Sequence, residues 1–376
     1  MCLPTQGVYQ ARKWSKRYSL VAILAALVEA TTSVYLVVWR DMGVIGVMLG
    51  TLAGGLFRTG VLVHFIRESI QFRFSTSEAS KMILYGLPML PERIFMVLNR
   101  MVAPFFLSRT AQSSQDDLLD TQTGMAKAGI FSVSMRFAQL VNILLYSPFL
   151  LAQPVAMFSA EKDHDAKEYY AKTLTYLVFL GVFLSLGVSA LCREVVPLVV
   201  GPEYHDAWKV VPLLCLAQVF SGLPAPLSPG LLLKRKTRFI PFSDAAGLAV
   251  NLLITVLLVR CLQLKDTGAA IGLVGAYFTV CVLRIVFNQR FLKVPWEWTR
   301  LAKAFAVGGA IYAVTYPIAL PNPWLSLTVK FLICLTFPFI LFLIRFYQPA
   351  EIRRIRKILG SLPVIGLLTD ELESEE

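Results

Sequence analysis

Charged residues are scarce in this sequence of 376 residues. Asp, Glu, Lys and Arg make up 16% of the chain and hydrophobic residues 56%, whereas soluble domains average about 25% charged residues. Its three histidines and six cysteines show neither a CxxC motif nor any other metal-ligand spacing. We therefore predict no metal, no cofactor and no redox chemistry, and the composition favours a membrane protein over a soluble enzyme.

Long hydrophobic runs recur along the whole chain. Crossing about 30 Å of hydrocarbon takes about 20 apolar residues in a helix. The runs predict an all-α, polytopic helical membrane protein with about ten transmembrane helices. The predicted windows are 19–39, 43–66, 81–107, 128–157, 173–192, 207–233, 241–260, 267–288, 301–320 and 324–345.

Positive charge is distributed unevenly between the connections. The net charge is +12, and Lys and Arg concentrate in alternate connections and at both ends of the chain. This bias follows the positive-inside rule, so we predict that both termini are cytoplasmic. The membrane topology thus accounts for the positive net charge, and nucleic acid is not an expected partner. The basic N-terminal flank runs directly into the first window, which predicts a transmembrane helix rather than a removable signal.

Three arginines interrupt the third and fourth windows. Arg93, Arg100 and Arg136 would each cost about 2.5–3.5 kcal/mol if they faced lipid at the bilayer centre. Arg93 and Arg100 are seven residues apart and share a helical face to within about 20°. They therefore face protein or a water-filled cavity, where they could bind an anion. The alternative is that they reach the interface or pair with neighbouring carbonyl groups.

The fourth window carries a polar stripe around Arg136. At 100° per residue, an arc of roughly 120° holds Ser132, Gln139, Asn142, Tyr146 and Gln153. In a membrane such a stripe faces an aqueous path or a hydrogen-bonded contact with another helix. Both interpretations remain open.

The first two windows each contain one charged residue at a similar depth. Glu29 and Arg58 would meet if the two helices are antiparallel neighbours, which predicts a structural ion pair. The alternative is that Glu29 takes up a proton or a sodium ion in a coupled transporter.

Several segments in order resemble a known family. They are GLPMLPERIFMVLNRMVAPFFL, AGIFSVSMRFAQLVNILLYSPFLLAQPVAMF, PEYHDAWKVVPLLCLAQVFSGL, PGLLLKRKTRFIPFSDAAGLAVNLLITVLLV and GAAIGLVGAYFTVCVLRIVFNQR. The chain resembles, over residues 12–320, the Wzx-like polysaccharide-biosynthesis flippases of the multidrug/oligosaccharidyl-lipid/polysaccharide exporter superfamily. This resemblance implies two six-helix lobes around a cavity with basic residues, which matches Arg93, Arg100 and Arg136. Asn99 stands where the family commonly has an acidic residue before the arginine, which would make the site more cationic.

The resemblance also implies a domain organisation. Residues 1–66 would be the last two helices of an N-terminal lobe, 67–80 a cytoplasmic linker and 81–290 a complete C-terminal six-helix lobe. Residues 291–346 would form an extra helix pair and 347–376 a cytoplasmic tail. Four helices of the family pattern have no counterpart, so we expect either a separate chain that supplies them or a truncated, inactive form.

These features agree to different degrees with three function classes. The first is a flippase that moves polyprenyl-diphosphate-linked oligosaccharide across the bacterial inner membrane by alternating access. Cavity residues Arg93, Arg100, Arg136, Gln139, Asn142 and Asn99 would hold the substrate, and its partners would be the lipid-linked glycan and membrane lipids. The second is a cation-coupled small-molecule exporter, which needs an essential carboxylate such as Glu29, Glu92 or Asp244. An enzyme is not expected, because the longest predicted outer loop, 108–127, is short and has the composition of a linker.

Overall fold

The computed structural model of the chain describes residues 15–66, 75–87, 90–109, 118–160, 165–234, 236–262, 264–318, 320–348 and 351. All regular secondary structure in these ranges is helical, which confirms the all-α prediction. Most of the predicted linker, the centre of the predicted outer loop and nearly all of the predicted tail lie outside the described residues.

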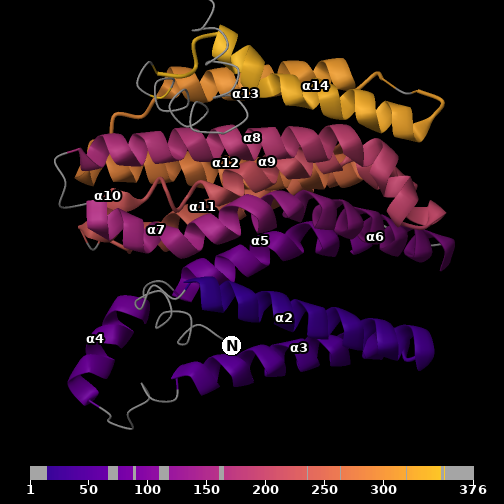
Figure 1. Cartoon of the computed structure of the whole chain (residues 1–376), viewed down its shortest axis with the longest axis horizontal. Helices are drawn as coiled ribbons and strands as arrows, with labels where there is room; N and C mark the ends of the chain where they lie inside the picture. The colour runs from indigo at the N-terminus through magenta and orange to yellow at the C-terminus, as the bar shows by residue number, and fades with distance from the viewer. Residues whose placement is uncertain are drawn as a thin grey trace, which may run out of the picture. The chain divides into compact units, whose positions relative to one another are not determined.

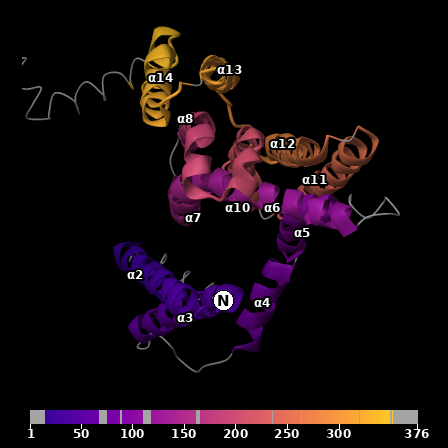
Figure 2. The same cartoon turned by 90° about the vertical axis from the view of Figure 1, so that its right-hand side faces the viewer.

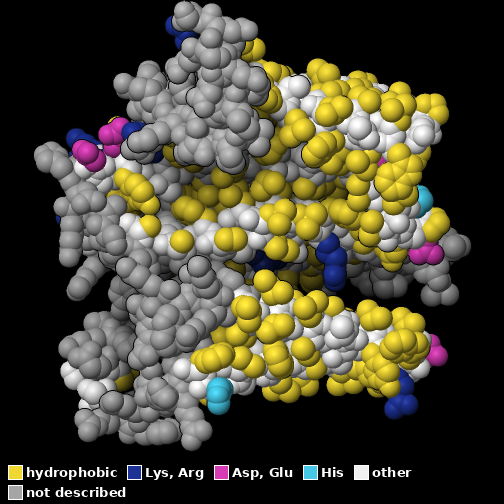
Figure 3. Space-filling model, in the orientation of Figure 1, with side chains coloured by type: hydrophobic (Ala, Val, Ile, Leu, Met, Phe, Trp, Pro, Cys, Tyr) yellow, Lys and Arg dark blue, Asp and Glu magenta, His cyan; other side chains and the backbone are white. Residues whose placement is uncertain are grey.

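Within the described ranges, seven helices are long and apolar enough to cross a membrane. They match seven of the ten predicted windows and show a polytopic membrane protein. The membrane-facing character is visible in Figure 3, where hydrophobic side chains dominate the described surface and charged ones are few. The seven spans are Leu20–Trp39, Gly43–Phe65, Ala126–Leu150, Ala166–Val199, Phe239–Val259, Asp266–Phe291 and Pro323–Leu343.

The other three windows form shorter or more polar helices. The window at 81–107 includes the last part of α4 (Thr76–Gly86) and most of α5 (Leu90–Arg109). The window at 207–233 divides into α9 (Val211–Gly222) and α10 (Pro229–Leu233). Proline cannot continue a helix without losing a backbone hydrogen bond; two prolines occur between α9 and α10, and a third is the first residue of α10. The third window forms α13 (Trp298–Thr315).

The chain forms two compact units. Unit 1 comprises Met1–Gly86 and Leu151–Ser159, and unit 2 comprises Leu87–Leu150 and Ala160–Glu376. The assignment of chain segments to two lobes, a linker, a helix pair and a tail stays a prediction.

Unit 1 contains two long helices that lie side by side (Figure 1). They are α2 (Ser15–Val34), which continues as the π-helical η1 (Tyr35–Trp39), and α3 (Gly43–Ile66). Their backbones approach closely because glycines of α3 face α2. A methyl group at Gly54 would lie 2.7 Å from the Cβ atom of Glu29, and one at Gly50 would overlap Ser33. In lipid, transmembrane helices gain packing contacts by placing small residues where two helices meet.

Unit 2 is built around α9 and α12 (Lys265–Phe291). α9 packs against α6 (Leu118–Val141), α8 (Ala166–Val199) and α12. α12 also packs against α5, α10 and α11 (Phe239–Val256). The helix pair α13 and α14 (Pro323–Leu343) packs on α8 (Figures 1 and 2). The remaining elements of unit 2 are η5 (Asn142–Tyr146), η6 (Pro202–Lys209) and η7 (Leu257–Cys261), whereas most of α7 (Ser147–Ala160) belongs to unit 1.

The helix of the fourth window contains a π-helical turn, η5, directly after Val141. This turn changes the direction in which the following side chains leave the helix. In η5 the backbone turns less per residue than in an α-helix, so the stripe drawn at 100° per residue is not continuous. Tyr146 is fully buried and packs against Gly181 and Gly222. Its hydroxyl group has no hydrogen-bond partner among the described residues. The prediction that Tyr146 faces water or a hydrogen-bonded contact was therefore wrong.

Candidate substrate-binding surface

Two of the arginines predicted to bind an anion lie on neighbouring helices at a similar depth. α5 and α6 pack against each other as consecutive, antiparallel helices (Figure 1), and both Arg93 and Arg136 are exposed. At 1.5 Å per residue, Arg93 lies about 24 Å from the last residue of α5, and Arg136 lies about 27 Å from the first residue of α6. Neither takes part in an ion pair among the described residues. Among the described residues, these two positive charges therefore have no acidic ion-pair partner.

The other predicted cavity residues differ in their surroundings. Gln139 and Asn142 are half-buried on α6 and η5, and the Asn142 side chain accepts a hydrogen bond from the Ser147 hydroxyl group at 3.2 Å. Arg100 is exposed on α5. Asn99, its neighbour in sequence, is only 3% exposed and faces α11. The structure therefore separates Asn99 from the exposed arginines, and its expected place in the cavity has no support in the geometry.

Glu29 and Arg58, which were expected to pair, belong to unit 1. The carboxylate of Glu29 accepts a hydrogen bond from the Thr51 hydroxyl group of α3 at 3.0 Å. This places Glu29 at the contact between α2 and α3, as the ion-pair prediction requires, but with a different partner in α3. Pairing with Arg58 stays a prediction.

A buried ion pair that the sequence did not reveal joins α11 and α12. Arg284 donates to Asp244 at 2.8 Å, to the Ser228 hydroxyl group at 3.2 Å and to the carbonyl oxygen of Ile240 at 3.4 Å. Asp244 also lies within electrostatic range of Glu92. Asp244, a candidate carboxylate for cation coupling, therefore already has a buried arginine as its ion-pair partner.

A second buried pair connects α8 with α14. Lys330 donates to Glu194 Oε1 at 2.6 Å, and the hydroxyl group of Ser326 donates to the same oxygen at 2.8 Å. Lys330 is 1% exposed and Glu194 is 9% exposed. The two residues are 136 positions apart in the sequence, so nothing local in the pattern predicted their contact.

A third charged cluster holds the segment after α14 against α13. Arg300 donates to Glu297 at 2.8 Å and to Glu351 at 2.9 Å, and the Gln348 side chain donates to Glu297 at 2.8 Å. Burial alone raises the pKa of Glu351. Hydrogen bonds from Tyr176 and Gln348, together with the charge of Arg300, outweigh burial and hold this pKa below its ordinary value. Glu351 therefore stays ionised at neutral pH.

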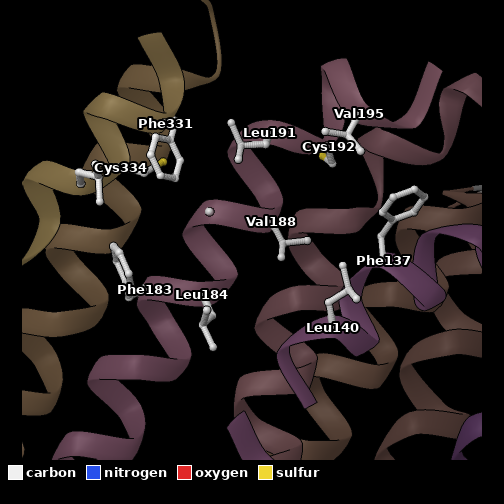
Figure 4. A pocket seen from close by; sticks show the side chains of 12 residues that line it. Phe137, Leu140, Phe183, Leu184, Val188, Leu191, Cys192, Val195, Phe331 and Cys334 are labelled. Atoms are coloured by element: carbon white, nitrogen blue, oxygen red, sulfur yellow. The ribbon is translucent and has the colours of Figure 1, made fainter. Parts of the chain in front are cut away.

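An apolar cavity of about 330 Å³ lies between α6, α8 and α14 (Figure 4). Its walls include Phe137 and Leu140 of α6, Leu184 and Val188 of α8, and Phe331 of α14. The described residues that line it include no charged side chain. Such a cavity suits a hydrocarbon chain and offers no partner for an anion.

Two comparisons place the chain among known proteins. A family model described as polysaccharide biosynthesis protein matches residues 4–209. Among solved structures, the chain is similar to one named "Lipid II flippase MurJ, inward closed conformation", with a TM-score of 0.61 and 13% sequence identity. The alignment covers 86% of this chain and 67% of that chain, and at this identity the likeness shows the fold alone. No curated protein gave a match.

Proposed function

Because the chain belongs to the polysaccharide biosynthesis protein family, we propose that it moves a polyprenyl-diphosphate-linked oligosaccharide across the bacterial cytoplasmic membrane. The membrane-spanning helices and the flippase-like fold support transport rather than covalent chemistry. In this proposal the substrate is held as the protein alternates between two access states. Both termini lie in the cytoplasm, and membrane lipids and a separate chain with further helices are candidate partners.

The observation that carries the proposal is the pair of exposed arginines on α5 and α6. A diphosphate is an anion with oxygens spaced to accept paired hydrogen bonds, and guanidinium groups supply them in a fixed geometry. Arg93 and Arg136 lie at similar depths, are exposed, and form no ion pair within the part of the chain that the structure describes. Gln139 follows on α6 and Asn142 begins η5, where their amide groups could contact sugar hydroxyl groups.

The apolar cavity supports the lipid part of the same proposal. Its lining is apolar, and it lies beside helices long enough to span the bilayer. We propose that part of the polyprenyl chain occupies it during transport. The anionic and apolar parts of one substrate would then have separate binding surfaces on unit 2.

The alternative, a cation-coupled small-molecule exporter, has less support. It requires a carboxylate inside the membrane that is free to bind a cation. Glu29 accepts a hydrogen bond from Thr51, and Asp244 is paired with Arg284. Exposed arginines would also repel cationic cargo.

The proposal is tested by Arg136→Ala in the native host, at the chain's own gene locus. We expect lipid-linked oligosaccharide to accumulate on the cytoplasmic side of the membrane and surface glycan to disappear, while the protein remains inserted. Arg136→Lys should retain part of the activity because it keeps the charge but loses the paired geometry. The matched control is Arg290→Ala, which removes an exposed arginine at the end of α12. Normal export by the Arg136→Ala strain would disprove the anion site.

A further inference from the structure

The helix that carries Arg136 contains the π-helical turn η5 in its interior. The backbone amide of Ser147 donates to the carbonyl oxygen of Asn142, five residues earlier. Such a bond encloses one more residue than the bond of an α-helix, so the side chains that follow are displaced around the axis by roughly one residue step, about 100°. Pro148 comes next and has no N–H group to donate. At that position, therefore, neither an α-helical nor a π-helical register gains a backbone hydrogen bond.

The π-helical turn decides which residue enters the packed interior. The buried face of α6 includes Ser134, Ala138 and Val141, at spacings of four and three residues. A continuous α-helix would bring Leu145 to this face, four residues after Val141. In the structure the next buried residue along the chain is instead Tyr146. The π-helical turn thus puts Tyr146 where an α-helix would put Leu145.

Tyr146 fills a narrow space between α8 and α9. A methyl group at Gly181 of α8 would overlap its hydroxyl oxygen, and one at Gly222 of α9 would overlap its ring. The Cδ2 atom of Leu145 would lie 3.7 Å from the same methyl position at Gly181. Leu145 is therefore already beside the space that the tyrosine occupies.

The burial of Tyr146 leaves a polar group unsatisfied. Its side chain is fully buried, and its hydroxyl group has no hydrogen-bond partner among the described residues. A buried hydroxyl group without a partner destabilises the state that contains it, whereas leucine has no polar group to bury. In an α-helical register Tyr146 would lie on the polar stripe, one turn after Asn142 and two turns after Gln139. Both of these residues are half-buried, and their amide groups can bond to a hydroxyl group.

The α-helical register that the sequence pattern predicts is not that of this structure, and we propose that it belongs to a second state of the same protein. In the state that the structure shows, η5 buries Tyr146. In the second state this turn rewinds as an α-helix, Leu145 takes the space between the two glycines, and the Tyr146 hydroxyl group joins Gln139 and Asn142 beside the substrate. Two discrete packings of one element are the kind of change that distinguishes two access states. The inference rests on the proposed function, because it adds Tyr146 to the surface that holds the same substrate.

The first test follows the surroundings of residue 146 by fluorine NMR. The purified full-length chain, with a ring-fluorinated tyrosine at position 146, is studied in lipid nanodiscs with a water-soluble gadolinium chelate as broadening agent and geranylgeranyl diphosphate as the probe. We expect one protected and one broadened resonance, and a change of about threefold or more in their ratio when the probe binds.

Deletion of Leu144 provides a variant that is locked in one state. Leu144 is an exposed residue of η5, and its removal takes out the extra residue of the turn. An α-helix then carries Tyr146 on the buried face without a π-helical turn. This variant should fold and show only the protected resonance, with or without the probe.

Tyr146→Phe is the second test, made in the native host. It removes both the unsatisfied hydroxyl group of the buried state and the hydrogen bonds that this group gains on the polar stripe. The variant should therefore melt at a higher temperature than the wild type but export lipid-linked oligosaccharide about fivefold more slowly. A tyrosine that only fills space would give the higher melting temperature with normal export. The matched control is Tyr170→Phe, which changes a buried tyrosine of α8 outside η5 and should export normally.

The inference is overturned if residue 146 shows only the protected resonance with and without the probe, or if Tyr146→Phe exports like the wild type. It also fails if the Leu144 deletion still shows both resonances. Probe binding that depends on Arg136 but leaves the resonances of residue 146 unchanged would defeat the inference and leave the proposed function intact. Two resonances in a protein that does not bind the probe would support the switch and defeat the proposed function.

Discussion

Replacing Lys330 by methionine removes one partner of the buried ion pair between α8 and α14. In the native protein, Lys330 and Ser326 both donate to Oε1 of Glu194, while Oε2 is buried without a hydrogen-bond partner among the described residues. Methionine is similar in length to the apolar stem of lysine but has no ammonium group. In the variant, the buried carboxylate keeps one hydroxyl donor and no opposite charge.

The expected loss follows from the burial of both residues. Breaking a buried pair by removing one partner costs about 3–5 kcal/mol, because an uncompensated charge remains. Since Ser326 keeps its hydrogen bond, we expect a loss of about 3 kcal/mol, at the lower end of that range. At about 2–4 °C per kcal/mol for a large domain, the melting temperature should fall by roughly 6–12 °C. Replacing Glu194 by methionine as well should recover most of this loss, since no buried charge is then left.

The measurement is thermal unfolding of the purified chain in detergent, followed by tryptophan fluorescence. Lys209→Met is the matched control, because Lys209 pairs with Asp206 at 2.7 Å on an exposed surface, with side-chain exposures of 55% and 67%. Exposed pairs contribute only about 0–1 kcal/mol, so this variant should melt close to the wild type. The reasoning is refuted if Lys330→Met also melts close to the wild type. It is refuted equally if the double variant is no more stable than the single one.

Two further predictions concern packing and pH. Gly222→Ala should destabilise unit 2 by about 1–3 kcal/mol, because the added methyl group would overlap the ring of Tyr146. Gly187→Ala meets no atom within 4 Å and should be neutral or slightly stabilising in the same thermal assay; equal melting temperatures would contradict the steric argument. The lowered pKa of Glu351 implies that its stabilising contacts are complete above the unfolded value of about 4.3 and lost as the pH falls through the folded value. Thermal stability should therefore decline on acidification below about pH 4.3, and less steeply in Glu351→Gln; identical pH profiles would show that this carboxylate does not contribute.

Much of the fold could be predicted because membrane insertion depends on local composition. Runs of about 20 apolar residues predict transmembrane helices whatever their neighbours are, and seven such helices are present among the described residues. The break after Gly86 was predictable for the same local reason, since glycine and proline weaken a helix wherever it packs. Helices were harder to predict in windows that contain several prolines or charges, because these helices are short and depend on tertiary contacts.

The candidate site was only partly predictable. Arg93 and Arg136 were identified from the cost of placing a charge in lipid, a property of the residue and its position in a window. The buried contacts of Arg284 and Asn288 were missed, although their spacing of four residues places these two polar groups on one face of α12. That spacing was the available signal, but it could not indicate which helix each side chain contacts.

The sequence by itself determined the class of protein, its helices, its family resemblance and the presence of arginines that cannot face lipid. These follow from free energies of transfer that depend on one residue or one short window at a time. Only the tertiary structure decided that Asn99 is buried against Asn251 while Arg100 is exposed, and that a π turn buries Tyr146. It also decided that Lys330 meets Glu194 across 136 residues. Such outcomes depend on which helices become neighbours and how each is rotated, and both are set by the packing of the whole unit.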